Sequence, residues 1–373
     1  DVYKRQAYEL EEAKKLVVAA GKKLVESGLI ARTWGNVSAR ISDTQFVITP
    51  SGRAYETLTP EEVVVVNIED CSYEGEIKPS SEKGVHAAAY RHHPTVDFVI
   101  HTHQKAATIV SITGMEIRNV YKEFQPVLGN KVPCADYAMS TTNSLRKKVE
   151  TCIMMNPGCR AIMLMHHGTL CMGDTYEQAF EIADALEKCC QRVIKDNYLR
   201  HSWAETYSDE GKRNFYLKKN GAVAMPERIC DLGSSVRNGK TFSLTVGGET
   251  IDVDLETGLG ITGIAPKCAK IHKAIYDSQD CSIIKHVTDP DVIAVSCTGE
   301  DMIPMIDDFA QIAGVDVKNR PWIDGDTDAC AKDIAKAMDS RNAILIQGNG
   351  AIITGNSDGD MQALEIIMAV SYT

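Results

Sequence analysis

The spacing of apolar residues predicts alternating helices and strands through the first two hundred residues. Apolar positions recur with a helical period over residues 7–27 and again in TYEQAFEIADALEKCCQRVIKDNYL, which begins at Thr175. Short apolar runs in TQFVITPSG, VDFVIHTH and RAIMLMHHG predict buried strands. EKGVHAAAYRHHP predicts a helix that ends before Pro94, and QKAATIVSI predicts another. This mixture predicts an α/β domain with a central sheet.

The second half of the chain repeats blocks of the first half. VSCTG at 295–299 matches VSITG at 110–114 with an offset of 185 residues. NAILIQGNGAIITG at 342–355 matches RAIMLMHHGTLCMG at 160–173 with an offset of 182, and KIHKAIYDSQ echoes GVHAAAYRHH. Near-constant offsets over three blocks indicate an internal duplication with small deletions.

We expect the duplicated domains to span residues 7–222 and 223–370. A polar connection followed by a hairpin, KTFSLTVGGETIDVDLE with Gly-Gly at its turn, is expected at the start of the second domain. The ends, DVYKRQ at 1–6 and residues 371–373, can both be encoded by one adapter oligonucleotide read in opposite senses. We interpret these ends as non-native and exclude them from either domain.

Composition narrows the class of protein. The 373 residues are 44% hydrophobic and 24% charged, which is typical of a globular chain of two domains. The net charge of −11 argues against a nucleic-acid partner, because a phosphate backbone needs a basic face. The apolar runs are too short to cross a bilayer, so we expect no membrane partner. The twelve cysteines show no CxxC spacing, so we expect reduced thiols in a cytoplasmic protein.

Histidines stand at the ends of two of the predicted strands. His101 and His103 are two residues apart, so on a regular strand both side chains lie on the same face. Neutral imidazole is a common ligand of divalent transition metals, and a third histidine, His166 or His167, ends another strand. Strand ends are where sites form in open α/β sheets, which favours a metal site over chance pairs.

The duplicated half offers an internal comparison for these histidines. In the gap-free register around VSxTG, His101 falls on His286 but His103 falls on Thr288. In the later block, the position of His167 is taken by an asparagine, Asn349. The apolar residues are retained while the possible ligands are lost, as expected if the histidines serve a site rather than the core.

Seven sequence blocks follow one another in the first half of the chain. They are RTWGNVSAR, VITPSG, LTPEEVVVVN, KPSSE, HTH, ADYA and HHG, within about residues 10–200. In this combination the first half resembles the class II aldolase/adducin family, and the second half resembles a degenerate copy of the same domain. The resemblance implies a three-layer α/β/α sheet domain that is duplicated along the chain.

The resemblance also implies a metal site. By motif position, His101, His103 and His167 bind a divalent metal, usually Zn²⁺, although such ligands also accept Mn²⁺ or Co²⁺. Glu82 of KPSSE is implied as a base that completes the metal shell without substrate. Its sequence position alone also fits a carboxylate favoured by the dipole at a helix N-terminus.

The implied activity is that of a metal-dependent aldolase, a carbon–carbon lyase. Such an enzyme cleaves a ketose 1-phosphate to dihydroxyacetone phosphate and an aldehyde through a metal-stabilised enediolate. Tyr137 of ADYA is implied as a proton donor across a subunit interface, although it also fits an ordinary half-buried tyrosine. Hydroxyl, amide and glycine groups implied to bind the substrate phosphate are Thr33, Asn36, Ser51, Gly52, Ser80 and Ser81.

Other activities share the same ligands. A pentulose-phosphate 4-epimerase, a sugar-acid phosphate decarboxylase and a thioribulose-phosphate dehydratase remain open, although the epimerases usually carry Asp where this chain has Glu82. An adducin-like assembly module without enzymatic activity is the other alternative. In the second half, Cys268 or a neighbour falls at the Glu82 position and no PSSE or TPSG remains, so we expect no catalytic metal there. The resemblance further implies a homo-oligomer, a dimer or tetramer of tandem chains.

Overall fold

The structure is a computed structural model that divides into two compact units between Asn197 and Tyr198. The described residues are 7–27, 35–222, 224–323 and 327–370. Thr33 of the expected phosphate site and both ends of the chain lie outside the described residues. The division falls within a helix, upstream of the boundary at residue 222 that the sequence repeat suggests. Among the described helices, none has the length and apolar composition needed to span a membrane.

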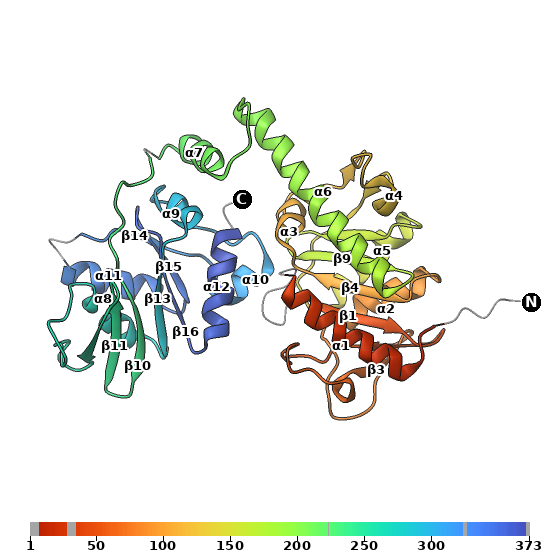
Figure 1. The fold of residues 1–373 in the computed structure, drawn as a ribbon, viewed down its shortest axis with the longest axis horizontal. Coiled ribbons are helices and arrows are strands. Elements are labelled where there is room, and N and C mark those ends of the chain that lie inside the picture. The colour runs from red at the N-terminus through yellow and green to blue at the C-terminus, as the bar shows by residue number, and fades with distance from the viewer. Residues whose placement is uncertain (1–6, 28–34, 223, 324–326, 371–373) are drawn as a thin grey trace, which may run out of the picture. The chain divides into compact units, whose positions relative to one another are not determined.

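The first unit is built around a seven-stranded sheet in the order β3-β2-β1-β4-β9-β8-β7 (Figure 1). Neighbouring strands are antiparallel except for the parallel pair β7–β8. Its elements in chain order are α1 (Leu10–Glu26), β1 (Asn36–Arg40), β2 (Gln45–Ile48), the 3₁₀ helix η1 (Pro60–Glu62), β3 (Val64–Asn67), α2 (Lys83–His92), β4 (Phe98–Thr102), α3 (Lys105–Ser111), β5 (Ile117–Arg118), α4 (Gln125–Leu128), β6 (Lys131–Val132), β7 (Cys134–Ala135), α5 (Asn143–Met155), β8 (Ala161–Leu164), β9 (Gly168–Gly173) and α6 (Tyr176–Ser202).

Helices cover both faces of this sheet, which confirms the three-layer α/β/α prediction. One hydrophobic cluster joins α1, α3 and α6 to one face, and a second joins α2 and α5 to the other. Strand β4 shows why both faces must be apolar. Phe98 and Ile100 belong to the first cluster, while Val99 between them belongs to the second. The continuous apolar run that predicted this strand therefore reflects burial on both faces.

The second unit repeats the architecture of the first. Its sheet has the order β12-β11-β10-β13-β16-β15-β14, with β14–β15 as the parallel pair (Figure 1). This is the strand order of the first sheet, so the predicted duplication is confirmed. Its elements are α7 (Asp209–Lys219), β10 (Ser234–Asn238), β11 (Thr241–Val246), β12 (Glu249–Asp254), α8 (Ala269–Ser278), β13 (Ile283–Val287), α9 (Pro290–Ser296), α10 (Asp307–Ala313), β14 (Asn319–Arg320), α11 (Thr327–Met338), β15 (Ala343–Ile346), β16 (Ala351–Gly355) and α12 (Asp358–Val370).

The predicted Gly-Gly hairpin joins β11 to β12. Val246 pairs with Glu249, and Gly247 and Gly248 between them have φ of 58° and 85°. Positive φ at both turn residues is the conformation that a two-residue hairpin favours and that glycine adopts without steric cost. In the first unit, residues 49–63 connect the corresponding strands β2 and β3.

The two sheets differ in how far their first three strands are covered. Every residue of β1 and three of the four residues of β2 are buried. On β11, the counterpart of β2, Phe242 and Leu244 are buried and the other residues are partly or fully exposed. On β10, Val236 is 48% exposed. Alternation of this kind is typical of a strand with one solvated face. The second copy has therefore lost cover on one side of β10 and β11.

Two buried histidines make stability depend on pH. Burial lowers the pKa of His86 in the first unit to about 3 and that of His272 in the second to about 4, whereas an unfolded histidine titrates near 6.5. Below pH 6.5 the unfolded chain binds protons that these folded side chains do not bind. Their contribution to stability is therefore complete above pH 6.5 and is lost as the pH falls towards 4.

We expect His272→Gln to flatten the pH dependence of unfolding of the second unit. Between pH 6.5 and 4, the free energy of unfolding should lose up to about 1.4 kcal/mol less per pH unit than in the wild type. Urea unfolding followed by circular dichroism at pH 7, 6 and 5 measures this slope, with His201→Gln at an exposed position as the control. Equal slopes for the wild type and His272→Gln would contradict the prediction.

Candidate metal centre

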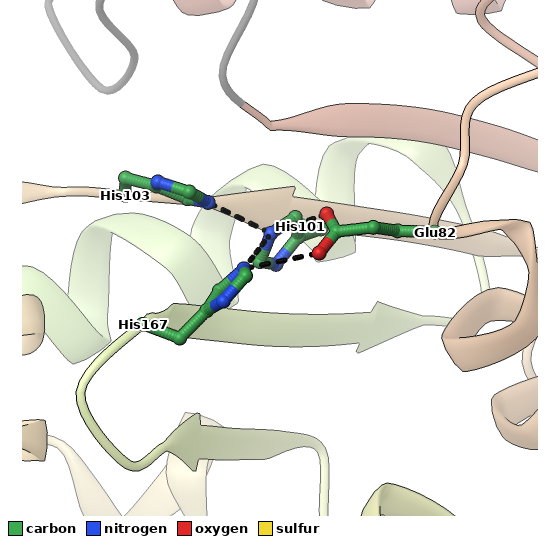
Figure 2. Close-up of side chains that lie close together, drawn as sticks. All are labelled: Glu82, His101, His103 and His167. Atoms are coloured by element: carbon green, nitrogen blue, oxygen red, sulfur yellow. Dashed lines mark hydrogen bonds and ion pairs between the residues drawn. The ribbon is translucent and has the colours of Figure 1, made fainter. Parts of the chain in front are cut away.

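Four side chains from three segments of the first unit converge on one point (Figure 2). His101 lies in β4, His103 directly follows that strand, His167 lies in the turn between β8 and β9, and Glu82 is the N-cap of α2. The Nε2 atom of His101 lies 2.9 Å from that of His103 and 3.1 Å from that of His167. The Glu82 carboxylate lies 3.1 Å from Nε2 of His101 and 3.2 Å from Nε2 of His167.

The sheet sets the orientation of the central imidazole. Nδ1 of His101 donates a hydrogen bond of 2.8 Å to the backbone carbonyl of Thr169 on the neighbouring strand β9. A carbonyl oxygen can only accept, so in the neutral ring the proton is on Nδ1 and the lone pair of Nε2 faces the cluster. A hydrogen bond of this kind fixes the tautomer of histidines that bind metals.

Burial and charge favour a neutral imidazole beside an ionised carboxylate. His101 is fully buried, and burial lowers its pKa, although the Glu82 carboxylate opposes this effect. Glu82 is 9% exposed. Burial opposes its ionisation, but the neighbouring His101 and His167 outweigh burial and hold the pKa of Glu82 well below its usual range. Neutral imidazole and ionised carboxylate are the protonation states in which these groups bind a cation.

The donor set fits a transition-metal ion. With metal–nitrogen distances of about 2.0–2.1 Å, two ligands of a tetrahedral ion lie about 3.3 Å apart. Four of the distances between ligand atoms in the cluster run from 2.9 to 3.2 Å, close to such an edge. In the described part of the chain, this is the group of histidine, cysteine and carboxylate side chains that can hold an ion, all within 4.8 Å of one another.

Only one of the two histidines of HHG belongs to the cluster. His167 is 2% exposed and belongs to the cluster, whereas the ring of His166 packs edge-on against Tyr137, with ring centroids 5.7 Å apart. His166 has a positive φ of 59°, so the chain reverses between the two residues. Tyr137 is 45% exposed and lies outside the cluster of four.

The expected phosphate-binding residues lie in two segments that run side by side. An isolated antiparallel β-bridge joins Pro50 to Pro79, so that the backbone N–H of Ser51 donates to the Lys78 carbonyl and that of Ser80 donates to the Thr49 carbonyl. Gly52 has a φ of 70°, a backbone conformation that a residue with a side chain adopts at a cost. Asn36 lies apart from this pair, opposite His101 in the β1–β4 register.

A small cavity of about 230 Å³ opens beside Glu82. Its walls include Ser81 and Lys83 at the start of α2, and Thr142 and Arg146 at the start of α5. Both helices present backbone N–H groups at these ends, and both basic side chains line the same space. Glu82 therefore borders a cavity whose walls carry hydroxyl groups and positive charge.

A second set of side chains supports Glu82 from behind, a role that was not predicted from the sequence. The Nδ2 amide of Asn36 donates to the Glu82 carboxylate at 3.2 Å, and Asn36 in turn hydrogen-bonds to His86. His86 contacts Ser38, which contacts Tyr90. The signal was present in the echo of GVHAAAYRHH by KIHKAIYDSQ, which repeats a histidine and a tyrosine four residues apart.

In the second unit, the equivalent of the metal site is filled by the protein's own backbone. Nε2 of His286 donates to the carbonyl of Asn349 at 2.6 Å, and its Nδ1 accepts from the backbone N–H of Leu232 at 3.2 Å. The side chain of Asn349 bonds to both the N–H and the carbonyl of Cys230. Cys268 is the N-cap of α8, as Glu82 is of α2, which places the thiol at the carboxylate position.

We expect Gly168→Ala to weaken metal binding, because this glycine has no space for a side chain. A Cβ atom there would lie 2.5 Å from the Thr102 carbonyl oxygen and 2.9 Å from Cδ2 of His103. The displaced ring should lower the metal affinity by about 10-fold to 100-fold, the usual cost of disturbing the support of a ligand. Titration with Co²⁺ measures the change, with Gly158→Ala in an open turn as the control. Unchanged affinity would show that the ring does not depend on this contact.

The comparisons with known proteins agree with the geometry. The model of the family "Class II Aldolase and Adducin N-terminal domain" matches residues 15–194 and again residues 239–367. A 5-deoxy-D-ribulose 1-phosphate aldolase of Bacillus thuringiensis serovar kurstaki is 33% identical over 183 residues, which are 49% of this chain and 84% of that protein. An L-fuculose phosphate aldolase of Escherichia coli K12 is 34% identical over 167 residues, 45% of this chain and 75% of the relative. An L-ribulose-5-phosphate 4-epimerase of Salmonella paratyphi B is 30% identical over 191 residues, 48% of this chain and 82% of the relative.

Proposed function

Because the chain belongs to the class II aldolase and adducin family, we propose that its first unit is a divalent-metal-dependent aldolase. The proposed reaction cleaves a phosphorylated ketose, a ketose 1-phosphate, to dihydroxyacetone phosphate and an aldehyde. The observation that carries the proposal is the cluster of Glu82, His101, His103 and His167, which is assembled in the first copy of the domain and dismantled in the second.

In this proposal the three histidines and Glu82 hold the cation, which is Zn²⁺ or another transition metal such as Mn²⁺ or Co²⁺. A bound divalent cation supplies Lewis-acid stabilisation of negative charge that develops on substrate oxygens. The chain's contribution is to present neutral imidazoles and an ionised carboxylate in a fixed arrangement. The hydrogen bond from His101 to Thr169 supports this role, because it turns the Nε2 lone pair toward the cluster.

Glu82 is the proposed base. Its carboxylate is ionised and lies within hydrogen-bonding distance of the ligand set, beside the opening lined by Ser81 and Lys83. A carboxylate in this place can accept the proton that leaves a substrate hydroxyl when the carbon–carbon bond breaks. Its position at the start of α2 also satisfies the helix dipole, so the structural and the chemical roles are compatible.

The substrate phosphate is proposed to bind where the two segments joined by the Pro50–Pro79 bridge meet. Ser51, Ser80 and Ser81 offer hydroxyl groups there, Gly52 offers a backbone N–H, and the resemblance adds Asn36 and Thr33. Tyr137 remains the proposed proton donor for a neighbouring subunit. Its 45% exposure leaves the phenol accessible to a second chain.

The second unit is proposed to be catalytically silent and to bind no metal. We retain 7–222 as the proposed catalytic domain and 223–370 as its shortened copy. We also propose that tandem chains assemble into dimers or tetramers and that the protein is cytoplasmic. A stable monomer with full activity in mass measurements would refute the assembly part of the proposal.

A 4-epimerase is the second candidate, because one relative with that name is 30% identical over 82% of its length. One experiment separates the candidates. Purified protein loaded with Zn²⁺ or Co²⁺ is mixed with ketose 1-phosphates, including L-fuculose and 5-deoxyribulose 1-phosphates, and with L-ribulose 5-phosphate. Release of dihydroxyacetone phosphate supports the aldolase, whereas an epimerised product without cleavage supports the alternative. A protein that binds no metal and converts none of these sugars would favour an adducin-like assembly module.

A further inference from the structure

A chain of four hydrogen bonds runs behind the metal centre, from the core of the first unit to Glu82. Tyr90 and Ser38 are joined through their hydroxyl groups at 2.7 Å, and Ser38 meets Nδ1 of His86 at 2.7 Å. Nε2 of His86 meets Oδ1 of Asn36 at 2.5 Å, and Nδ2 of Asn36 meets the Glu82 carboxylate at 3.2 Å. The chain therefore connects β1 and α2 across the layer interface.

The chemistry of the groups fixes the direction of each hydrogen bond. A carboxylate only accepts, so the amide of Asn36 must turn its NH₂ toward Glu82 and its oxygen toward His86. That oxygen also only accepts, so the single proton of the neutral His86 ring is on Nε2. Nδ1 of His86 then accepts from the Ser38 hydroxyl, which in turn accepts from Tyr90. Every donor in this series, from the Tyr90 hydroxyl to the Asn36 amide, therefore points toward Glu82 and the metal centre.

Burial makes the arrangement hard to reverse. His86 and Ser38 are fully buried, Tyr90 is 1% exposed and Asn36 is 5% exposed, so water does not compete for these groups. If the Asn36 amide were flipped, its oxygen would face the Glu82 carboxylate and its NH₂ would face the His86 N–H. Both contacts would be repulsive, so the His86 tautomer and the amide orientation depend on one another.

The second unit contains the serine, histidine and tyrosine of this hydrogen-bond chain but lacks the asparagine and the carboxylate. Ser235 meets Nδ1 of His272 at 2.7 Å and the hydroxyl of Tyr276 at 2.8 Å. Nε2 of His272 donates to the backbone carbonyl of Leu232 at 2.7 Å, and the β10–β13 register places Gly233 where the first unit has Asn36. The serine, histidine and tyrosine thus serve the core in both copies, but only in the first copy do they reach a carboxylate.

We infer that His86 and Ser38 are positioning residues for the metal centre, acting on Glu82 through the amide of Asn36. This inference rests on the proposed metal-dependent function. The hydrogen-bond chain holds the Glu82 carboxylate in one orientation, because it keeps the amide donor of Asn36 directed at that carboxylate. The repeated triad in the second unit separates this role from packing, because His272 has the same local partners and no carboxylate to orient.

Two amide substitutions separate the nitrogens of the His86 ring. His86→Gln places an NH₂ group near the Nε2 position and keeps the donor to Asn36, whereas His86→Asn reaches only the Nδ1 position and removes that donor. Titration of the metal-free chain with Co²⁺ gives the affinity, and the visible spectrum of bound Co²⁺ reports on its ligands. We expect His86→Asn to bind Co²⁺ about 10-fold to 100-fold more weakly than the wild type, and His86→Gln to bind close to the wild type.

The matched variants are His272→Asn and His272→Gln, which alter the same triad in the second unit and should leave Co²⁺ binding unchanged. The spectrum of His86→Asn should shift toward that of Glu82→Gln. Adding His86→Asn to Glu82→Gln should cause no further loss of affinity, because the effect runs through that carboxylate. If His86→Asn does not fold, Ser38→Ala, which frees the His86 tautomer, gives the same test, with Ser235→Ala as its control.

The outcomes distinguish the inference from the function on which it rests. A wild-type chain that binds no Co²⁺ refutes the proposed metal-dependent function, and the inference falls with it. Wild-type binding that is equally strong in His86→Asn overturns the inference alone. Equal losses in the His86 and His272 variants, or a further loss in the double variant with Glu82→Gln, would show that the triad is only a packing element.

Discussion

Replacing His103 with alanine is expected to reduce the metal content from about one ion per chain to none and to lower kcat/KM at least about 1000-fold. Lewis-acid stabilisation is worth several kcal/mol, and about 4 kcal/mol corresponds to a thousandfold change in rate. His103 is the ligand to change, because it is partly exposed and follows β4, whereas His101 is fully buried within that strand. Elemental analysis of protein purified without added metal measures the content, and the cleavage assay measures kcat/KM.

The control for this experiment is His286→Gln, which changes the counterpart of His101 in the second unit. Its imidazole bonds to backbone groups of Asn349 and Leu232, so the metal content should stay at about one per chain. Two ions per wild-type chain, or loss of metal in His286→Gln, would show that the second unit also binds a cation.

Glu82→Gln is expected to lower kcat about 100-fold to 10,000-fold, the usual contribution of a positioned general base. The amide has the shape of the carboxylate but cannot accept the proton, and its oxygen can still accept the hydrogen bond from the amide of Asn36. Single-turnover measurements with saturating Co²⁺ isolate the chemical step from any loss of metal affinity. Cys268→Ala, at the equivalent N-cap of the second unit, should leave kcat unchanged.

Glu82→Asp tests whether the length of the side chain matters as well as its charge. The shorter carboxylate withdraws from the cluster, where Glu82 lies 3.1 Å from His101 and 3.2 Å from His167. We expect Glu82→Asp to cleave the substrate with a kcat between those of the wild type and Glu82→Gln. A kcat for Glu82→Gln equal to that of the wild type would remove Glu82 from the proton-transfer step altogether.

The three histidines of the cluster could be predicted from the sequence because their signals are local. HTH places two histidines on one face of a strand, HHG ends a second strand, and both strands are apolar along their whole length because both faces are covered. The duplication added a second signal, because the apolar residues of these blocks recur near 286 and 349 while the histidines do not all recur. Local spacing left His166 and His167 equivalent, and only the turn between β8 and β9 separates them.

The support behind Glu82 could not be found in this way because its partners are distant in the sequence. His86 bonds to Ser38 and Asn36, which lie on a strand about fifty residues earlier in the chain. Within GVHAAAYRHH, the i, i+4 spacing of His86 and Tyr90 predicts only that both lie on one buried face of a helix. Their hydrogen bonds exist only once α2 packs on β1, and no spacing rule encodes that packing. The filling of the second site by the backbone around Cys230 likewise has no sequence motif.

The short hairpin of the second unit sets a limit on engineering. Restoring histidine at 288 and 349 and glutamate at 268 would supply ligand types but not the proposed phosphate-binding loop, because Gly247 and Gly248 replace the whole segment 49–63 that contains Ser51 and Gly52. The transplant would have to include that loop, as well as Asn at 233 to continue the hydrogen bonds from His272. A variant with two active centres therefore requires the grafted segment. Point mutations alone would yield at most a metal site without the proposed phosphate-binding loop.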